Sequence, residues 1–237
     1  VKVPMREDRE DLPALVDMAA SEKAKVLYIS NPNNPMGSWW DAAAVSAAIA
    51  KVPNGTLLIL DEAYCDTAPP GTTPPLDMTN AQVVRYRTSS KAYGLAGARI
   101  GYALGHADVI QAFDKVRNHY GINRVGQLGA LAALHDQQYL AEAVARIRRA
   151  RDRISDVARA NGLTALPSAT NFVAIDCGQD GAFAKRVLDG LIARDVFVRK
   201  PAVTPQDRCI RVSCGRDEDI AIFAEALPHA IADALKA

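Results

Sequence analysis

Hydrophobic residues in the first half of the chain alternate between helical spacing and strand-like runs. Helical spacing predicts helices over residues 10–21 and 42–50. Strand-like runs occur at residues 1–5, 24–30, 56–60, 81–91 and 98–105. Strands that alternate with helices in this way predict an α/β protein with a mostly parallel sheet.

The second half of the chain is helical at first and then changes to short strands. Helices are expected over residues 106–116, 123–135 and 139–161. Further on, short strands are expected around residues 170–175, 196–200 and 209–214, flanked by helices at 180–195 and 217–235. The change predicts a large domain at residues 1–136 and a smaller α+β domain at residues 137–237.

The charge balance argues against nucleic acid or a membrane as a partner. The 237 residues include 28 basic and 27 acidic side chains, a net charge of +1, which produces no strong field around the protein. An arginine-rich stretch at residues 146–153 is interleaved with alanine and isoleucine, which favours a solvated helix face. No apolar run is long enough to span a bilayer and no signal peptide is evident, so we expect a cytoplasmic protein.

Four cysteines are spread along the chain, at positions 65, 177, 209 and 214. They form no CxxC pair and have no histidine at ligand spacing, so we expect neither a metal site nor a disulfide framework. Small buried thiols in a reducing compartment are the simpler interpretation.

Polar side chains occur where three of the expected strands end. Asn34 follows one strand, Asp61 the next and Lys91 a third. Because ligands bind at the carboxyl ends of strands in open parallel sheets, these groups could converge on one crevice. Each also has an ordinary interpretation: Asn34 as a turn residue, Asp61 as a helix cap and Lys91 as a surface lysine.

Together these residues suit an aromatic aldehyde that carries a ring nitrogen, a phenolic oxygen and a phosphate. The Lys91 amine can condense with the aldehyde, and the Asp61 carboxylate can stabilise a protonated ring nitrogen, which makes the ring a better electron sink. Asn34 and Tyr64 can hydrogen-bond the phenolic oxygen. The remaining polar groups supply hydroxyls and a guanidinium for the phosphate, namely Thr88, Ser90 and Arg99.

Three motifs in this order resemble pyridoxal 5′-phosphate enzymes of the aspartate aminotransferase fold, and most closely the histidinol-phosphate aminotransferase group. The motifs are NPNNPMG at 31–37, LDEAY at 60–64 and TSSKAYGLAGARIGY at 88–102. Two later segments agree with the resemblance, NRVGQLGALAAL at 123–134 and IRVSCG at 210–215. The resemblance covers essentially the whole chain, although any one motif alone could arise by accident.

The resemblance implies a transaminase of amino-acid biosynthesis, with pyridoxal 5′-phosphate as its cofactor. Lys91, Asp61 and Tyr64 would be catalytic, with Lys91 forming the Schiff base and then acting as the base. Arg211 would bind the α-carboxylate of the substrate beside Asn34, or else form a surface ion pair. Arg124 could bind a second acidic group of the substrate or pair on the helix surface.

The resemblance leaves two other functions open. An amino-acid decarboxylase or lyase of the same fold would share every cofactor contact. A ligand-sensing domain of a transcription regulator is also possible, although the chain shows no basic recognition helix. Small-molecule amino acids and 2-oxo acids are the expected partners, and the family resemblance implies a homodimer.

Three features depart from the family pattern, one of which is Arg124, an unusual residue beside the cofactor helix. Met36 stands where the family commonly has threonine. The family also has more than a hundred residues ahead of the point where this sequence starts, including a phosphate-binding glycine loop and an aromatic residue that stacks on the cofactor. We therefore expect the sequence to be the later part of a longer protein.

Overall fold

The computed structural model describes residues 1–236, which separate into two compact units. The first unit comprises residues 1–33 and 39–144, and the second comprises residues 34–38 together with the chain from residue 145 onward. The domain limits expected from the sequence stay a prediction. None of the helices in the described part is both long and apolar enough to cross a membrane.

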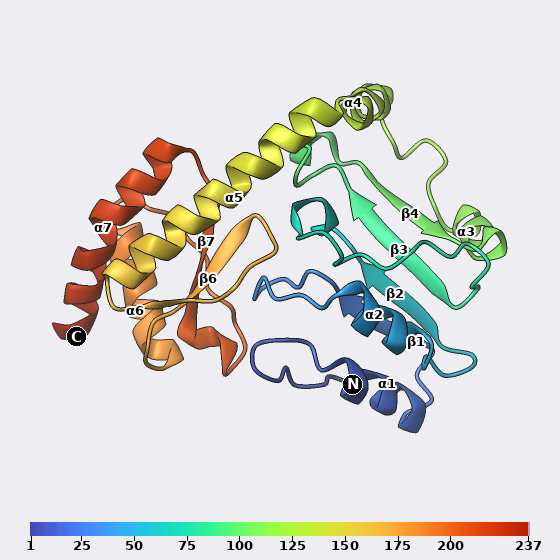
Figure 1. Cartoon of the computed structure of the whole chain (residues 1–237), viewed down its shortest axis with the longest axis horizontal. Coiled ribbons are helices and arrows are strands. Elements are labelled where there is room, and N and C mark those ends of the chain that lie inside the picture. Colours follow the sequence, from blue (N-terminus) through green and yellow to red (C-terminus); the bar gives the residue numbers. More distant parts are fainter. Residues whose placement is uncertain (237) are drawn as a thin grey trace. The chain divides into compact units, whose positions relative to one another are not determined.

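The first unit is built around a four-stranded sheet, whose strands and helices are labelled in Figure 1. Its elements are α1 (Leu12–Ser21), β1 (Val26–Ser30), α2 (Ala42–Ile49), β2 (Leu57–Asp61), η1 (Cys65–Thr67), β3 (Val83–Thr88), η2 (Ala96–Ala98), β4 (Gly101–Gly105), α3 (Ala107–Ala112), η3 (Phe113–Lys115) and α4 (Arg124–His135). Helix α5 (Gln137–Ala160) begins in this unit and continues into the second.

The strands of the first unit follow one another in the order β1-β2-β3-β4. Strands β1, β2 and β3 are parallel, and β4 runs antiparallel to β3. In this register Ser30 lies opposite Asp61, and Asp61 lies opposite Tyr86. The carboxyl ends of the three parallel strands therefore meet at one edge, as a mostly parallel sheet requires.

One face of this sheet is covered by α1 and α2, and the other is open at β1. Side chains at alternate strand positions, such as Ile29 and Leu60, are buried in a core with residues of both helices. Val26 and Tyr28 point to the opposite face and are each 52% exposed. Because successive strand residues alternate between faces, Asp61 lies on the same face as Tyr28.

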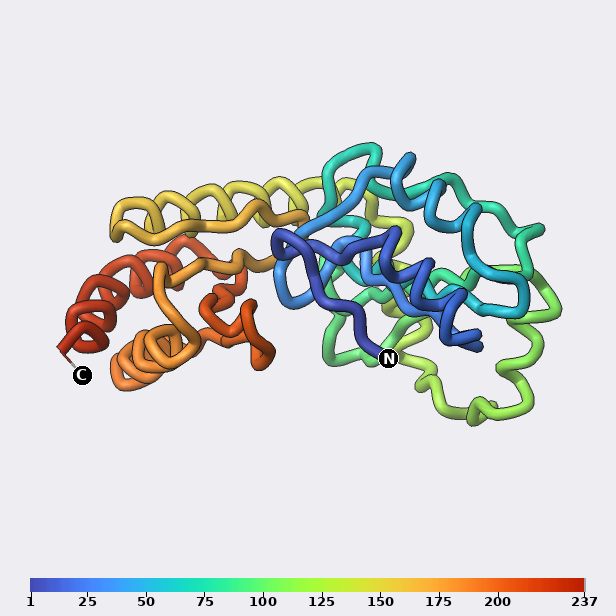
Figure 2. The backbone as a smooth tube through the Cα atoms, turned by 90° about the horizontal axis from the view of Figure 1, so that it is seen from below, coloured from blue at the N-terminus to red at the C-terminus, as the bar shows by residue number. Residues whose placement is uncertain are grey.

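The second unit contains a three-stranded antiparallel sheet in the order β5-β6-β7. Its elements beyond α5 are β5 (Thr164–Ala165), β6 (Phe172–Asp176), α6 (Gly181–Ile192), η4 (Gln206–Arg208), β7 (Cys209–Ser213) and α7 (Asp217–Lys236). Helices α6 and α7 lie side by side (Figure 2). A Cβ at Gly190 would lie 3.0 Å from the Cα of Ala230, so this glycine permits their close approach.

Two strands expected from the sequence are absent from the described structure. Residues 1–5 form no strand, and residues 196–200 contribute only an isolated bridge between Arg199 and Arg211. Alternating hydrophobicity indicates that a segment can join a sheet, but a strand also needs a hydrogen-bonding neighbour along its length. Within residues 1–236, neither segment has such a neighbour over several residues.

A buried ion-pair cluster holds the segment that follows β2. Glu62 is 2% exposed, and its Oε1 accepts a 2.5 Å hydrogen bond from Arg85 Nη2 while its Oε2 accepts a 2.9 Å bond from Arg87 Nε. Arg85 also donates to the carbonyls of Pro74 and Pro75, each at 3.0 Å. The cluster therefore ties the turn beyond Asp61 to strand β3 and to the proline-rich loop.

A second carboxyl group, which is partly buried, holds the segment that follows β1. The Glu10 oxygens accept hydrogen bonds from the Ser30 amide, the shorter at 3.1 Å, and from Asn33 Nδ2 at 3.0 Å. Burial raises the pKa of Glu10 to about 7, and the charge of Asp61 adds to the rise, while the hydrogen bonds from Ser30 and Asn33 oppose it. Glu10 therefore changes charge near neutral pH.

Replacing Glu62 with alanine is expected to lower the free energy of unfolding by about 3–5 kcal/mol, because it leaves a buried arginine without its counter-charge. Urea unfolding followed by circular dichroism measures the loss. The exposed Glu225→Ala provides the matched control and should change stability by less than about 0.5 kcal/mol. A loss below about 1 kcal/mol in Glu62→Ala would show that the cluster is not a structural support.

Replacing Glu10 with glutamine is expected to change how stability depends on pH. Because the pKa of Glu10 is raised to about 7 in the folded state, the wild-type protein loses the stability supplied by the neutral carboxyl group as pH rises toward 7. A glutamine side chain does not titrate, so the stability of Glu10→Gln relative to wild type should rise by about 2–3 kcal/mol from pH 5 to pH 8.

Urea unfolding at the two pH values measures this difference, with the exposed Glu225→Gln as control. Equal pH dependence in Glu10→Gln and wild type would contradict the assigned burial of this carboxyl group.

Candidate functional site

The carboxyl edge of the first unit's sheet carries two of the predicted site residues. Asp61 is the last residue of β2, and Thr88 is the last residue of β3. Asp61 pairs with Tyr86 in the parallel register, and Thr88 lies two residues beyond Tyr86. Side chains two residues apart share a face, so the Asp61 carboxylate and the Thr88 hydroxyl lie on the same face of the sheet.

Each oxygen of the Asp61 carboxylate accepts a hydrogen bond from an uncharged donor. Asp61 Oδ2 accepts from the Tyr28 hydroxyl at 2.5 Å, and Oδ1 accepts from the Ala63 amide at 2.9 Å. The contact with Tyr28 is not predicted by the sequence, because Tyr28 lies 33 residues away and has the pattern of an ordinary strand residue. Only the strand register brings these two residues together.

Lys91 and Tyr64 are neighbours in the first unit. Lys91 Nζ lies 5.1 Å from the centroid of the Tyr64 ring, within cation–π range. Tyr64 is buried, and its carbonyl accepts a 3.0 Å hydrogen bond from the Thr67 amide of η1. The expected strand does not extend to Lys91, because β3 ends at Thr88 and the lysine lies in a turn closed by Gly94.

Thr88 and Ser90 place two hydroxyl groups together just beyond β3. Thr88 Oγ1 lies 2.9 Å from Ser90 Oγ and accepts a 3.1 Å hydrogen bond from the Ser90 amide. Thr88 Oγ1 also lies 3.1 Å from the Ile100 carbonyl, to which it donates. Two hydroxyls together at the end of a strand are suited to a phosphate.

Arg99 lies at the end of the short η2 turn in an unusual backbone conformation. Its φ is 57°, which is in the left-handed region, and its guanidinium is exposed and donates to the Ala96 carbonyl at 2.9 Å. Its predicted role in binding phosphate stays a prediction.

Helix α4 begins against the turn that carries Arg99. A Cβ at Gly126 would lie 3.0 Å from the Ala98 carbonyl oxygen, and Asn123 Nδ2 donates to the same carbonyl at 3.4 Å. Glycine therefore lets the helix approach this turn closely. Arg124, the first residue of α4, is exposed, and its predicted contact with a substrate stays a prediction.

Asn34 and Arg211 belong to the second unit, where they are in direct contact. Arg211 Nη1 donates a hydrogen bond to Asn34 Oδ1, and the Arg211 guanidinium lies 4.7 Å from the centroid of the Phe172 ring. Arg211 lies in β7 and Phe172 in the adjacent strand β6. These contacts hold the guanidinium in a defined orientation, and the structure thus joins two residues that are 177 positions apart in sequence. Met36, which departs from the family pattern, is buried in the same unit.

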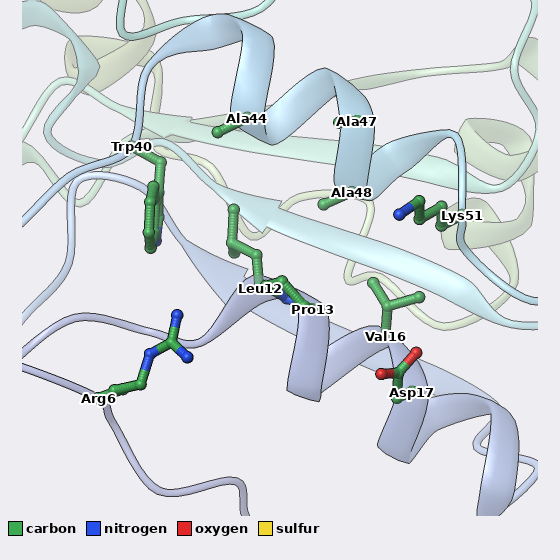
Figure 3. A pocket seen from close by; sticks show the side chains of 10 residues that line it. All are labelled: Arg6, Leu12, Pro13, Val16, Asp17, Trp40, Ala44, Ala47, Ala48 and Lys51. Carbon is green, nitrogen blue, oxygen red and sulfur yellow. The ribbon is translucent and has the colours of Figure 1, made fainter.

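A hollow of about 300 Å³ between α1 and α2 contains none of the predicted site residues (Figure 3). Its walls are mostly apolar, with Trp40 and Leu12 near one end and Lys51 at the other. Three charged side chains also line it, Arg6, Asp17 and Lys51, but none of them belongs to the predicted site, and we place the candidate chemistry at the carboxyl edge of the sheet.

The donor set at that edge fits pyridoxal 5′-phosphate. A carboxylate held by neutral donors suits a cationic ring nitrogen, since no basic side chain among these donors neutralises it. The amine beside the Tyr64 ring suits an aldehyde next to a phenolic oxygen, and the Thr88 and Ser90 hydroxyls suit the phosphate.

Comparison with known proteins connects this arrangement with one enzyme family. The family model described as aminotransferase class I and II matches residues 3–227. Histidinol-phosphate aminotransferase 2 from Pseudomonas fluorescens (strain Pf0-1) is 36% identical over 233 residues, which are 97% of this chain and 62% of that protein. The enzyme of the same name from Pasteurella multocida (strain Pm70) is 34% identical over 230 residues, 96% of this chain and 62% of that protein.

A solved structure gives the same result. The crystal structure of histidinol-phosphate aminotransferase from Sinorhizobium meliloti in complex with pyridoxal 5′-phosphate has a TM-score of 0.97 and 49% sequence identity, covering 98% of this chain and 64% of that one. The chain thus spans a little under two thirds of the length of these relatives. The expected fold of the pyridoxal-phosphate-dependent transferases is confirmed, and the chain belongs to the aminotransferase class I and II family.

Proposed function

We propose that this protein is a pyridoxal-phosphate-dependent aminotransferase that moves an amino group between an amino acid or amino phosphate and a 2-oxo acid. The proposal rests on the groups at the carboxyl edge of the sheet. Asp61 and Thr88 end the adjacent parallel strands β2 and β3, and Lys91 follows β3. Family membership supports the same reaction. The three relatives are named for histidinol phosphate, which makes this amino phosphate the first donor to test.

The residues of the first unit divide the work of the reaction. Bound pyridoxal 5′-phosphate would supply the aldehyde and the electron sink. The Lys91 amine would take a proton from the α-carbon of the amino donor and deliver it to the former aldehyde carbon of the cofactor, and it would move a proton in the opposite direction when the 2-oxo acid receives the amino group. Asp61 would provide the negative charge that keeps the ring nitrogen protonated, and Tyr64 would hold the phenolic oxygen.

The phosphate and the substrate carboxylate need separate anchors. Thr88 and Ser90 provide hydroxyl donors for the cofactor phosphate, and Arg99 adds a positive charge when its side chain turns toward that phosphate. Arg211 provides a planar guanidinium for the α-carboxylate of the 2-oxo acid or of an amino-acid donor, and Asn34 already holds that guanidinium by a hydrogen bond. Arg124 is the candidate for a second acidic group, such as the phosphate of the donor.

The proposal includes a homodimer in the cytoplasm. Large apolar side chains are exposed along α4 at intervals of three residues, at Val125 (82%), Leu128 (59%), Leu131 (54%) and Leu134 (40%). An exposed row of this kind supports a contact between this helix and another polypeptide surface. The balanced net charge of +1 supports partners that are small molecules rather than nucleic acids.

Replacing Lys91 with alanine is expected to lower the rate of transamination about 10³-fold or more, because the amine that moves the proton is lost. The assay mixes the purified protein, pyridoxal 5′-phosphate and 2-oxoglutarate with histidinol phosphate or, in a parallel reaction, with an amino acid. Glutamate is measured in both reactions and carbon dioxide in the reaction with the amino acid. Borohydride treatment followed by mass spectrometry should find a pyridoxyl group on the Lys91 peptide of the wild-type protein. The exposed Lys51→Ala is the control and should retain both properties.

Carbon dioxide without glutamate in the reaction with the amino acid would show decarboxylation in place of transamination. A Lys91→Ala protein as active as wild type would refute the proposed function.

Replacing Arg211 with lysine is expected to raise the KM for 2-oxoglutarate about 10-fold to 100-fold, because lysine cannot form the paired hydrogen bonds of a guanidinium with a carboxylate. Steady-state kinetics with varied 2-oxoglutarate concentration measure this change. Arg199→Lys is the matched control, because Arg199 is exposed and bridges Arg211 only through the backbone. An equal rise of KM in both variants would show that any arginine-to-lysine change at this edge of the sheet has the same effect. The role of Arg211 in binding a carboxylate would then be refuted.

A further inference from the structure

The hydroxyl of Tyr28 contacts the carboxylate of Asp61, which in the proposed function binds the ring nitrogen of the cofactor. Tyr28 lies in the middle of β1 and pairs with Ile59 of β2 in the parallel register. Asp61 lies two residues beyond Ile59, on the same face, so the tyrosine ring reaches along the sheet toward the carboxylate. The resulting hydrogen bond from the Tyr28 hydroxyl to Asp61 Oδ2 is 2.5 Å long.

The two hydrogen bonds to Asp61 fix the plane of its carboxylate. The Tyr28 hydroxyl binds Oδ2 from the neighbouring strand, and the Ala63 amide binds Oδ1 from the turn that follows. A carboxylate held at one oxygen can still rotate about its last bond, whereas donors at both oxygens restrict that rotation. Each oxygen retains a further acceptor position for another donor.

Tyr28 is suited to this contact because it donates a proton without carrying a charge. A lysine or arginine in its place would neutralise Asp61 and would compete with a cationic ring nitrogen for the same carboxylate. Burial, the hydrogen bond to Asp61, and the charges of Asp61 and Glu10 together raise the pKa of Tyr28 above its usual range, although a hydrogen bond with Ser30 opposes the rise. Tyr28 is therefore a neutral donor at every pH at which the protein would work.

Glu10 lies near the hydrogen bond between Tyr28 and Asp61 and adds a second reason for it. Its carboxyl group lies close enough to Asp61 for the charge of Asp61 to contribute to the raised pKa of Glu10, and it is held by Ser30 and Asn33 at the end of β1. A donor on Asp61 offsets this repulsion, since hydrogen bonds to a charged acceptor are stronger than those between neutral groups. Tyr28 thus donates to the carboxylate that lies beside Glu10.

We propose that Tyr28 is a positioning residue that holds Asp61 in the orientation and charge state needed to bind the ring nitrogen of pyridoxal 5′-phosphate. This inference rests on the proposed function, because it requires Asp61 to face that nitrogen. Tyr28 itself touches neither cofactor nor substrate in this scheme, and it acts through Asp61 alone.

The test compares Tyr28→Phe with wild type in the presence of ¹⁵N-labelled pyridoxal 5′-phosphate. The ¹⁵N chemical shift of the bound ring nitrogen reports its protonation, and equilibrium dialysis reports cofactor affinity. Tyr28→Phe is expected to weaken cofactor binding about tenfold and to move the ¹⁵N signal toward that of the unprotonated ring, because one hydrogen bond to a charged group is lost. Asp61→Asn is the reference variant and should move the signal further in the same direction.

Two controls separate the hydroxyl from general effects. Tyr120→Phe removes a hydroxyl from a side chain that is 95% exposed, and Val26→Ala alters a residue on the same face of β1 as Tyr28 with the same 52% exposure. Both variants should keep the wild-type ¹⁵N signal. A Val26→Ala protein that behaves like Tyr28→Phe would overturn the proposal in favour of a disturbed strand.

A measurement without cofactor covers the case in which Tyr28→Phe does not fold. The residue at position 28 is replaced by 3-fluorotyrosine, which retains the hydroxyl, and its ¹⁹F resonance is compared in the presence and absence of Asp61→Asn. The resonance is expected to shift in Asp61→Asn, and an unchanged resonance would refute the hydrogen bond. If Asp61→Asn moves the ¹⁵N signal and Tyr28→Phe does not, only the role of Tyr28 fails; if neither moves it, the proposed role of Asp61 fails as well.

Discussion

The parallel register of β1, β2 and β3 is the constraint on which the candidate site of the first unit depends. It brings the carboxyl ends of three strands to one edge, although the residues that follow them lie about thirty positions apart in sequence. It also decides which face each side chain occupies, since a slip of one residue would move Asp61 to the face covered by α1 and α2. The backbone hydrogen bonds of the sheet thus position the chemistry before any side chain contributes.

Most helices and strands could be predicted from hydrophobic spacing, because each buries one face of a regular element. The central strands β1 to β3 can be recognised in this way, and the helices can be placed to within a few residues. The segments at 1–5 and 196–200 show the limit of the method. Their alternating hydrophobicity shows that these segments are able to form strands. Whether they do so depends on a neighbouring strand to pair with, and hydrophobic spacing does not identify that neighbour.

The site was predictable only where a motif marks it. Lys91, Asp61 and Asn34 lie in recognisable motifs, and the structure adds that Asn34 contacts Arg211 in the second unit. Tyr28 and Glu10 lie in no such motif, since one has the pattern of a strand residue and the other that of a helix start. Their contacts with Asp61 and with the end of β1 exist only after the sheet has formed, so sequence reasoning had no signal by which to find them.

The first unit places three carboxyl groups near the ends of its strands and treats each in a different way. Glu62 forms ion pairs with Arg85 and Arg87, so its negative charge is balanced inside the protein. Glu10 has hydrogen bonds from neutral groups, and burial raises its pKa to about 7, so it can take up a proton to relieve its desolvation. Asp61 is half-buried and receives donors that leave its charge in place. A sheet edge that must attract a cation needs one carboxylate whose charge is not already neutralised, and the partners of these three groups make Asp61 that carboxylate.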